Sequence, residues 1–224
     1  SVADEPVAPL PPPAGDPGQL GDVMVTSQKF KQTLREVPAS VTVLDGEFLK
    51  QAKIQTINDI NGYVPSTQVR VTPFAGEVRI RGYGTPPSNL GFESSVGAIV
   101  DDVYYGRTAF LSAILFDIDR FEVVRGPQGA LFGKNTIAGV LNVATTPVQD
   151  YLNGDFMFTA QDIDTRDVRF GVTAPLAPDF GLRYAGSISR DEGLYYNTTL
   201  DRPEGNVDAV SSRLKFEWKL SDTL

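Results

Sequence analysis

The sequence predicts an α+β unit followed by four antiparallel β-strands, and three observations support this prediction. Short strand patterns, joined irregularly by Gly and Pro turns, fill residues 40–146 together with two helix-start signals. From about residue 150 the chain changes to longer runs in which apolar and polar residues alternate. Ahead of both parts, a Pro-rich acidic stretch predicts an extended tether.

The α+β unit is predicted to contain two short helices and six strands. Residues 40–44 alternate as a strand, and Asp45 can cap a helix that runs to Ala52. Thr56 and Asp59 form a capping-box pattern for a second helix, which Pro65 ends. The other strands are expected at residues 68–71, 78–81, 96–100, 121–124 and 140–144.

The C-terminal strands are predicted at residues 155–161, 168–173, 182–189 and 213–220. The last run is the clearest: Leu214, Phe216, Trp218 and Leu220 share one face, and Arg213, Lys215, Glu217 and Lys219 share the other. A tight turn at 177–180, a long polar loop at 193–208 and an unusually short link at 162–167 are expected between them. Short turns on one rim and long loops on the other are typical of an outer-membrane barrel. A soluble antiparallel sheet with one wet face predicts the same alternation and stays open.

Composition excludes several classes of function. The 224 residues include no Cys and no His, which excludes disulfide frameworks, Cys/His metal sites and His-dependent nucleophiles. The net charge of −8 argues against a nucleic-acid partner. No stretch approaches the roughly 18 apolar residues of a spanning helix. An enzyme would therefore have to use carboxylates, Lys, Ser or Tyr. Because nothing in the sequence resembles such a catalytic site, we expect no enzyme, no catalytic residues, no cofactor and no metal site.

Two motifs that suggest chemistry have simpler explanations. The Gly-rich segment 126–136 is not a phosphate loop, because Gln128 and Asn135 occupy positions where the Walker pattern requires Gly and Ser or Thr. Its glycines are expected to permit a tight turn. Clustered carboxylates, such as Asp101 with Asp102, are expected to form turns and helix caps.

Several motifs, in order, resemble the plug of TonB-dependent outer-membrane receptors. They are residues 37–43, 59–66, 80–84, 95–107, 118–135 and 138–143, and the resemblance spans roughly 22–147. It implies a periplasmic tether at 1–21, a TonB box at 22–28, a plug at 29–148 and the first four barrel strands at 149–224. Barrels of the family have about 22 strands and four strands cannot close one, so we expect this chain to be a fragment.

The resemblance also implies function, location and partners. It predicts a receptor in the outer membrane of a Gram-negative bacterium that imports a scarce, bulky solute, by default a ferric siderophore or another iron chelate. Cobalamin, a saccharide or an aromatic compound are alternative substrates, and a soluble extracytoplasmic binding or adhesion module is the alternative class. The implied partners are TonB with the ExbB-ExbD motor, outer-membrane lipid and lipopolysaccharide, the small-molecule or metal-chelate ligand, and a surface lipoprotein as an accessory.

Site residues follow from the resemblance in three groups. The TonB box is Asp22, Val23, Met24, Val25 and Thr26, a short extended segment that a partner can add to its own sheet as a strand. Apical-loop residues expected at the ligand are Phe74, Tyr83, Asn89, Phe92, Tyr105 and Arg107. Charged residues expected to lock the plug to the barrel are Arg79, Arg81, Glu122 and Arg125.

Overall fold

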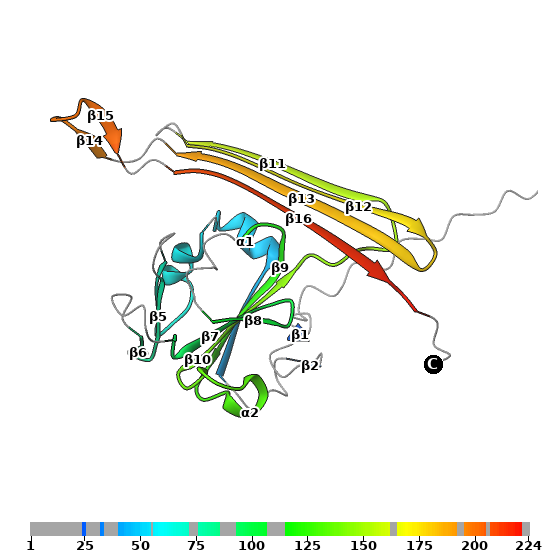
Figure 1. Ribbon diagram of the computed structural model, residues 1–224, viewed down its shortest axis with the longest axis horizontal. Helices are drawn as coiled ribbons and strands as arrows, with labels where there is room; N and C mark the ends of the chain where they lie inside the picture. Colours follow the sequence, from blue (N-terminus) through cyan, green and yellow to red (C-terminus); the bar gives the residue numbers. More distant parts are fainter. Residues whose placement is uncertain are drawn as a thin grey trace, which may run out of the picture.

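The protein has two layers, an α+β unit and a long C-terminal sheet that lies along one side of it (Figure 1). In a computed structural model the described residues are 24–25, 32–33, 40–54, 56–71, 76–85, 93–106, 115–161, 165–191, 195–204 and 207–220. Within this described part, no helix is long and apolar enough to cross a membrane.

A five-stranded mixed sheet with the order β3-β9-β10-β7-β8 is the centre of the α+β unit. The strands are β3 (Ser40–Asp45), β7 (Val96–Val100), β8 (Val103–Tyr105), β9 (Ile118–Arg125) and β10 (Gly139–Thr145). β10 pairs parallel with β7 and antiparallel with β9, which places Leu141 between Ala98 and Val123. All three of these side chains are fully buried, as expected for strands covered on both faces.

Both predicted helix starts are present. Helix α1 (Gly46–Gln51) begins where the Asp45 carboxylate accepts a 2.7 Å hydrogen bond from the Phe48 amide. The Thr56 and Asp59 capping box opens η2 (Ile57–Gly62), which is a 3-10 helix. η2 stops at Gly62, ahead of the predicted end at Pro65. A third short helix, α2 (Gly129–Phe132), lies in the Gly-rich segment.

The sheet β4-β5-β6 has an edge that side chains complete. Its strands are β4 (Thr67–Val71), β5 (Gly76–Ile80) and β6 (Tyr83–Gly84). On the free side of β4, Asn61 donates to the Val69 carbonyl at 2.8 Å and accepts from the Val69 amide at 2.6 Å. Asn58 does the same with Val71, at 2.8 and 2.7 Å. The two amides of η2 thus replace a neighbouring strand.

Apolar side chains from most of these elements form one main core. It is built from Leu44, Leu49, Ile54, Ile57, Ile60, Val64, Val69, Val71, Val78, Ile80, Val96, Ala98, Val100, Leu115, Phe121, Val123, Ala138, Leu141 and Val143. Burial on this scale is the main source of folding free energy for the unit, at roughly 1.5–3 kcal/mol for each fully buried large side chain.

The C-terminal sheet is antiparallel with the order β11-β12-β13-β16. Its strands are β11 (Asn153–Gln161), β12 (Thr165–Ala177), β13 (Phe180–Asp191) and β16 (Val207–Trp218). Pro178 and Asp179 form the predicted tight turn between β12 and β13. The predicted long loop contains a hairpin of β14 (Tyr195–Asn197) and β15 (Arg202–Glu204), and β16 begins at Val207 rather than at residue 213.

The two faces of this sheet are inverted relative to a soluble sheet. The face toward the α+β unit, here called the inner face, buries the polar residues Asp167, Thr173 and Arg183. The opposite face exposes large apolar side chains: Phe156, Phe158, Val172, Tyr184, Ile188, Val210, Leu214, Phe216 and Trp218. A sheet with polar residues inside and apolar residues outside fits a surface surrounded by lipid.

A further strand pair is formed by β1 (Met24–Val25) and β2 (Gln32–Thr33). The two run antiparallel, with Met24 opposite Thr33 and Val25 opposite Gln32. The backbone of this N-terminal segment can therefore adopt strand geometry and pair with another strand.

Candidate functional site

Arg183 is the centre of the contact between the two layers. Its side chain, on the inner face of β13, is only 2% exposed. Its Nε lies 3.1 and 3.0 Å from the two carboxylate oxygens of Asp117, and its Nη2 also contacts Asp117. Asp155 on β11 and Thr173 on β12 accept further hydrogen bonds, both at 3.0 Å. One buried cation thus joins three strands of the C-terminal sheet to the α+β unit. The four strands β11, β12, β13 and β16 are called the wall from here on.

The backbone on both sides gives this ion pair its geometry. Asp117 precedes β9 in a left-handed conformation with φ of 57°, and its side chain is 5% exposed. Gly171 on β12 lies beside the guanidinium, where a Cβ would collide with Arg183 and Asp155. A buried charge is costly unless it is paired and hydrogen-bonded. Arg183 meets both conditions, because Asp117 and Asp155 carry the opposite charge and accept its hydrogen bonds.

Two more arginines hold the residues just before Asp117. Arg169 on β12 donates to the Leu115 carbonyl at 3.3 Å. Arg213 on β16 donates to the Phe116 carbonyl at 2.8 Å, and its guanidinium carbon lies 4.5 Å from the centre of the Phe116 ring. The ring geometry adds a cation–π attraction to the hydrogen bond.

Lys215 on β16 binds a second segment of the α+β unit. Its Nζ donates to the carbonyls of Thr145 and Thr146 at 3.2 and 3.1 Å, and lies 3.3 Å from Asp101. Partial burial opposes ionisation of Asp101, but hydrogen bonds from the side chain and backbone of Thr145 and the charge of Lys215 outweigh it and lower the pKa of Asp101. The carboxylate is therefore charged at neutral pH.

We call Arg169, Arg183, Arg213 and Lys215 the wall cluster. Sequence analysis placed Arg213 and Lys215 on a polar face but gave none of the four a partner. The sequence feature that marks these four residues is the alternation of cations with apolar residues along β12, β13 and β16. It indicates a polar face but does not show what covers that face.

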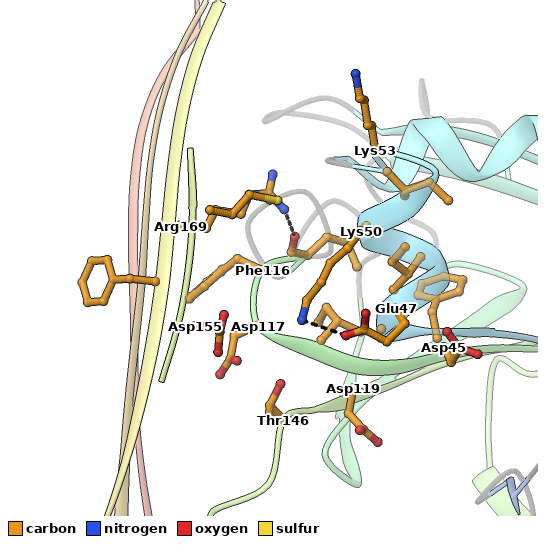
Figure 2. A pocket seen from close by; sticks show the side chains of 18 of the residues that line it. Asp45, Glu47, Lys50, Lys53, Phe116, Asp117, Asp119, Thr146, Asp155 and Arg169 are labelled. Atoms are coloured by element: carbon orange, nitrogen blue, oxygen red, sulfur yellow. Dashed lines mark hydrogen bonds and ion pairs between the residues drawn. The ribbon is translucent and has the colours of Figure 1, made fainter. Parts of the chain in front are cut away.

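A cavity of about 460 Å³ lies beside the wall cluster, between α1 and the inner face. In Figure 2, Glu47 and Lys50 reach in from α1, and Asp155 and Arg169 belong to the C-terminal strands opposite. Glu47 and Lys50 pair with each other at 3.2 Å. Within the described ranges, no group of three or more acidic side chains is arranged to hold a metal ion.

Comparison with known proteins identifies the α+β unit. Residues 33–140 match the family described as TonB-dependent Receptor Plug Domain. The chain carries the plug of a TonB-dependent receptor. The five-stranded sheet, its short helices and the antiparallel strands after it agree with this assignment. Proteins of this family are transporters and not enzymes, as the sequence analysis predicts.

Relatives extend the similarity beyond the plug. The chain is 32% identical to the vitamin B12 transporter BtuB of Vibrio vulnificus over 178 residues, which cover 76% of this chain and 28% of that protein. It is 27% identical to the iron-regulated outer membrane virulence protein of Vibrio cholerae over 188 residues, with the same coverage of both chains. The chain thus spans less than a third of the length of these relatives.

Solved structures share the fold. The ferric yersiniabactin uptake receptor FyuA from Yersinia pestis superposes with a TM-score of 0.69 at 20% identity, covering 82% of this chain and 29% of that one. The ferripyoverdine receptor of the outer membrane of Pseudomonas aeruginosa gives a TM-score of 0.62 at 18% identity, covering 76% and 23%. The plug and the four strands after it therefore share their fold with the corresponding parts of these receptors.

The predicted TonB box is described only at its centre. Met24 and Val25 form β1, whereas Asp22, Val23 and Thr26 lie outside the described residues. The pairing of β1 with β2 is a feature that the sequence did not predict.

The apical-loop residues are also described in part. Tyr83 starts β6 and is 71% exposed, and Tyr105 ends β8 and is partly buried against the main core. The remaining four, Phe74, Asn89, Phe92 and Arg107, fall outside the described residues. A role of these residues in ligand binding remains a prediction.

The predicted lock residues have contacts within the plug. Arg79 pairs with Glu77 at 2.5 Å, and the fully buried Glu122 accepts hydrogen bonds from Arg120 at 2.8 Å and Asn142 at 3.0 Å.

Arg125 and Arg81 complete this group. Arg125 donates to Ser40 at 3.0 Å and to the Pro65 carbonyl at 3.2 Å. Burial and the nearby charge of Arg81 lower the pKa of Arg125. Arg81 lies in a turn with φ of 53°, which is why β5 ends at Ile80 and not at Arg81 as predicted. The plug is contacted from the C-terminal sheet by Arg169, Arg183, Arg213 and Lys215, and the predicted lock stays a prediction.

Proposed function

We propose that this chain forms the plug and the first four wall strands of a receptor that imports a scarce, bulky solute across the outer membrane, driven by TonB. The arrangement that carries the proposal is a plug held by cations on the polar inner face of a sheet whose outer face is apolar. Such a plug blocks passage until work is done on it, and TonB with the ExbB-ExbD motor would supply that work.

The segment from Asp22 to Thr26 is the proposed point of attachment. Its centre already has strand geometry in β1, which supports recognition by strand addition. Replacing Val25 with Pro removes a backbone donor, so we expect active uptake to be lost while ligand binding at the cell surface is retained. Uptake and binding by cells that carry the full-length receptor measure the two effects separately.

A matched control is Leu20→Pro, which adds another proline to a stretch that already contains many. It should leave uptake unchanged. Normal uptake by the Val25→Pro receptor would refute the proposed box.

An iron chelate is the proposed cargo. Solved structures with the same fold include a ferric yersiniabactin uptake receptor and the siderophore receptor PirA from Pseudomonas aeruginosa, and relatives include a hemin receptor and a ferrioxamine receptor of Yersinia enterocolitica. The relative at 32% identity is a vitamin B12 transporter, which supports cobalamin as the second candidate. Binding of a panel of ferric siderophores and of cyanocobalamin to the full-length receptor would separate them.

A further inference from the structure

The wall holds the plug unevenly. Segments at 115–117 and 145–146 are bound by side chains of β12, β13 and β16. Helix α1, by contrast, faces the wall across the cavity of about 460 Å³. The parts of the plug held by the wall are therefore the residues directly before β9, the residues at the end of β10, and Asp101 between β7 and β8.

The position of these contacts decides where a pull on the N-terminus is resisted. A pull on Val25 reaches the five-stranded sheet at Ser40, the first residue of the edge strand β3. β3 pairs antiparallel with β9, with Ser40 opposite Arg125 and Asp45 opposite Arg120. Arg183 binds Asp117, next to the start of β9, so the pull and the restraint act at opposite ends of this ladder. Force along the strands then loads all of its hydrogen bonds together instead of opening them one at a time.

We propose that the wall cluster, centred on the Arg183–Asp117 pair, is a fixed anchor that keeps residues 115–146 seated on the wall while TonB pulls the plug. The proposal rests on the proposed function. It makes Arg183 and Asp117 positioning residues, since neither needs to contact the solute. The anchor confines any displacement to the parts of the plug that the wall cluster does not hold, which include α1 beside the cavity.

Weakening the anchor should let TonB dislodge the whole plug. We would compare Arg183→Gln and Asp117→Asn in the full-length receptor, using vancomycin, which an intact outer membrane excludes, as the probe. We expect a several-fold fall in the inhibitory vancomycin concentration in cells with TonB, and wild-type resistance in cells without TonB. Asp117→Asn is the milder change, because the amide keeps the shape of the carboxylate and one acceptor oxygen.

Arg190→Gln is the matched control. Arg190 lies on the same strand and pairs with Asp208 at 3.0 Å, but both side chains are more than half exposed. This variant should stay resistant. Heat-modifiable mobility of each receptor in outer-membrane preparations confirms that it is folded. Wild-type resistance of both anchor variants in cells with TonB would overturn the proposal, and so would sensitivity of equal size in cells without TonB.

A covalent tether supplies the second test. This chain has no cysteine, so Asp117→Cys with Arg183→Cys adds its only two thiols. A short, reducible bifunctional thiol reagent that joins them should restore vancomycin resistance, and a reductant should remove it. The tethered receptor should still import whichever of ferric enterobactin or cyanocobalamin the parent receptor imports. A tether that blocks this import would show that the cluster must open, and would overturn a fixed anchor.

The Val25→Pro receptor keeps the two proposals apart. If uptake survives Val25→Pro, the proposed attachment of TonB is wrong whatever the anchor variants do. If uptake is lost on Val25→Pro but the anchor variants stay resistant to vancomycin, only the anchor is wrong.

Discussion

The position of the Arg183 side chain depends on its neighbour Gly171, which has no side chain. A Cβ at Gly171 would occupy the space of the guanidinium and of the Asp155 carboxylate. The glycine is therefore required for close approach. Sequence reasoning could not single it out, because the chain has 21 glycines and only the packing shows which one makes room for a buried cation.

Gly171→Ala should destabilise the receptor. Forcing one methyl group into a packed ion cluster costs about 1–3 kcal/mol of unfolding free energy, since Arg183 must move away from Asp117. Thermal unfolding of the full-length receptor in detergent measures the change. Gly154→Ala on the neighbouring strand is the control, because its Cβ would make ordinary contacts at 3.4 and 3.7 Å. Equal midpoints for the two variants would contradict this account of Gly171.

The ion pair of Asp101 with Lys215 should make the stability of the folded protein depend on pH in the acid range. Its pKa is lowered in the folded protein, so its contribution to stability is present above the unfolded pKa, about 3.9, and is lost as pH falls through the folded pKa. Asp101→Asn should therefore lower the unfolding midpoint at neutral pH, and the difference from wild type should shrink below about pH 4. A difference that is constant with pH would exclude this charge as the cause.

At the scale of elements, the sequence predicted helix starts correctly where the capping residue and its hydrogen-bond partner are close together in the chain. The Asp45 cap and the Thr56–Asp59 box involve residues three apart, and both are present. β7 has the predicted bounds, Val96–Val100, because a continuous apolar run has only one place to be buried. The contacts of Asn58 with Val71 and of Asn61 with Val69 join separate elements, and no local pattern reports them.

Removing one of these amides should loosen β4. Asn61→Ala leaves the amide and carbonyl of Val69 without their partner, at a cost of about 1–3 kcal/mol. Hydrogen exchange of the Val69 amide and thermal unfolding of the full-length receptor both report the loss. Gln68→Ala, at an exposed position of the same strand, should change neither. Unaltered protection at Val69 in Asn61→Ala would show that water replaces the side chain at no cost.

For the whole molecule, the sequence predicted two faces of the C-terminal sheet but not which face is covered. Alternation in β16 separates Leu214 from Arg213 and Lys215 equally well in a soluble sheet and in a membrane wall. The structure distinguishes them, since Arg183 is buried by the plug while Leu214 is 52% exposed. The sequence could not predict the wall cluster for the same reason, because its partners in the plug lie 54 to 114 residues away along the chain.

Leu214→Arg should therefore harm the receptor more than Glu217→Arg. An arginine on a lipid-facing position toward the middle of the bilayer costs about 2–4 kcal/mol, whereas Glu217 lies on the other face of the same strand. The folded fraction of full-length receptor in the outer membrane, read from heat-modifiable mobility, is the measurement. A larger loss for Glu217→Arg would mean that the faces are assigned the wrong way round.

The side-chain amides of Asn58 and Asn61 cover the free edge of β4, which matters before the receptor is assembled. An open strand edge is a template on which a second copy can begin to aggregate. Asn58 and Asn61 occupy the hydrogen-bonding groups of Val69 and Val71 without adding a strand that itself has a free edge. A plug that folds before any wall surrounds it is thus protected at this edge from sticking to its neighbours.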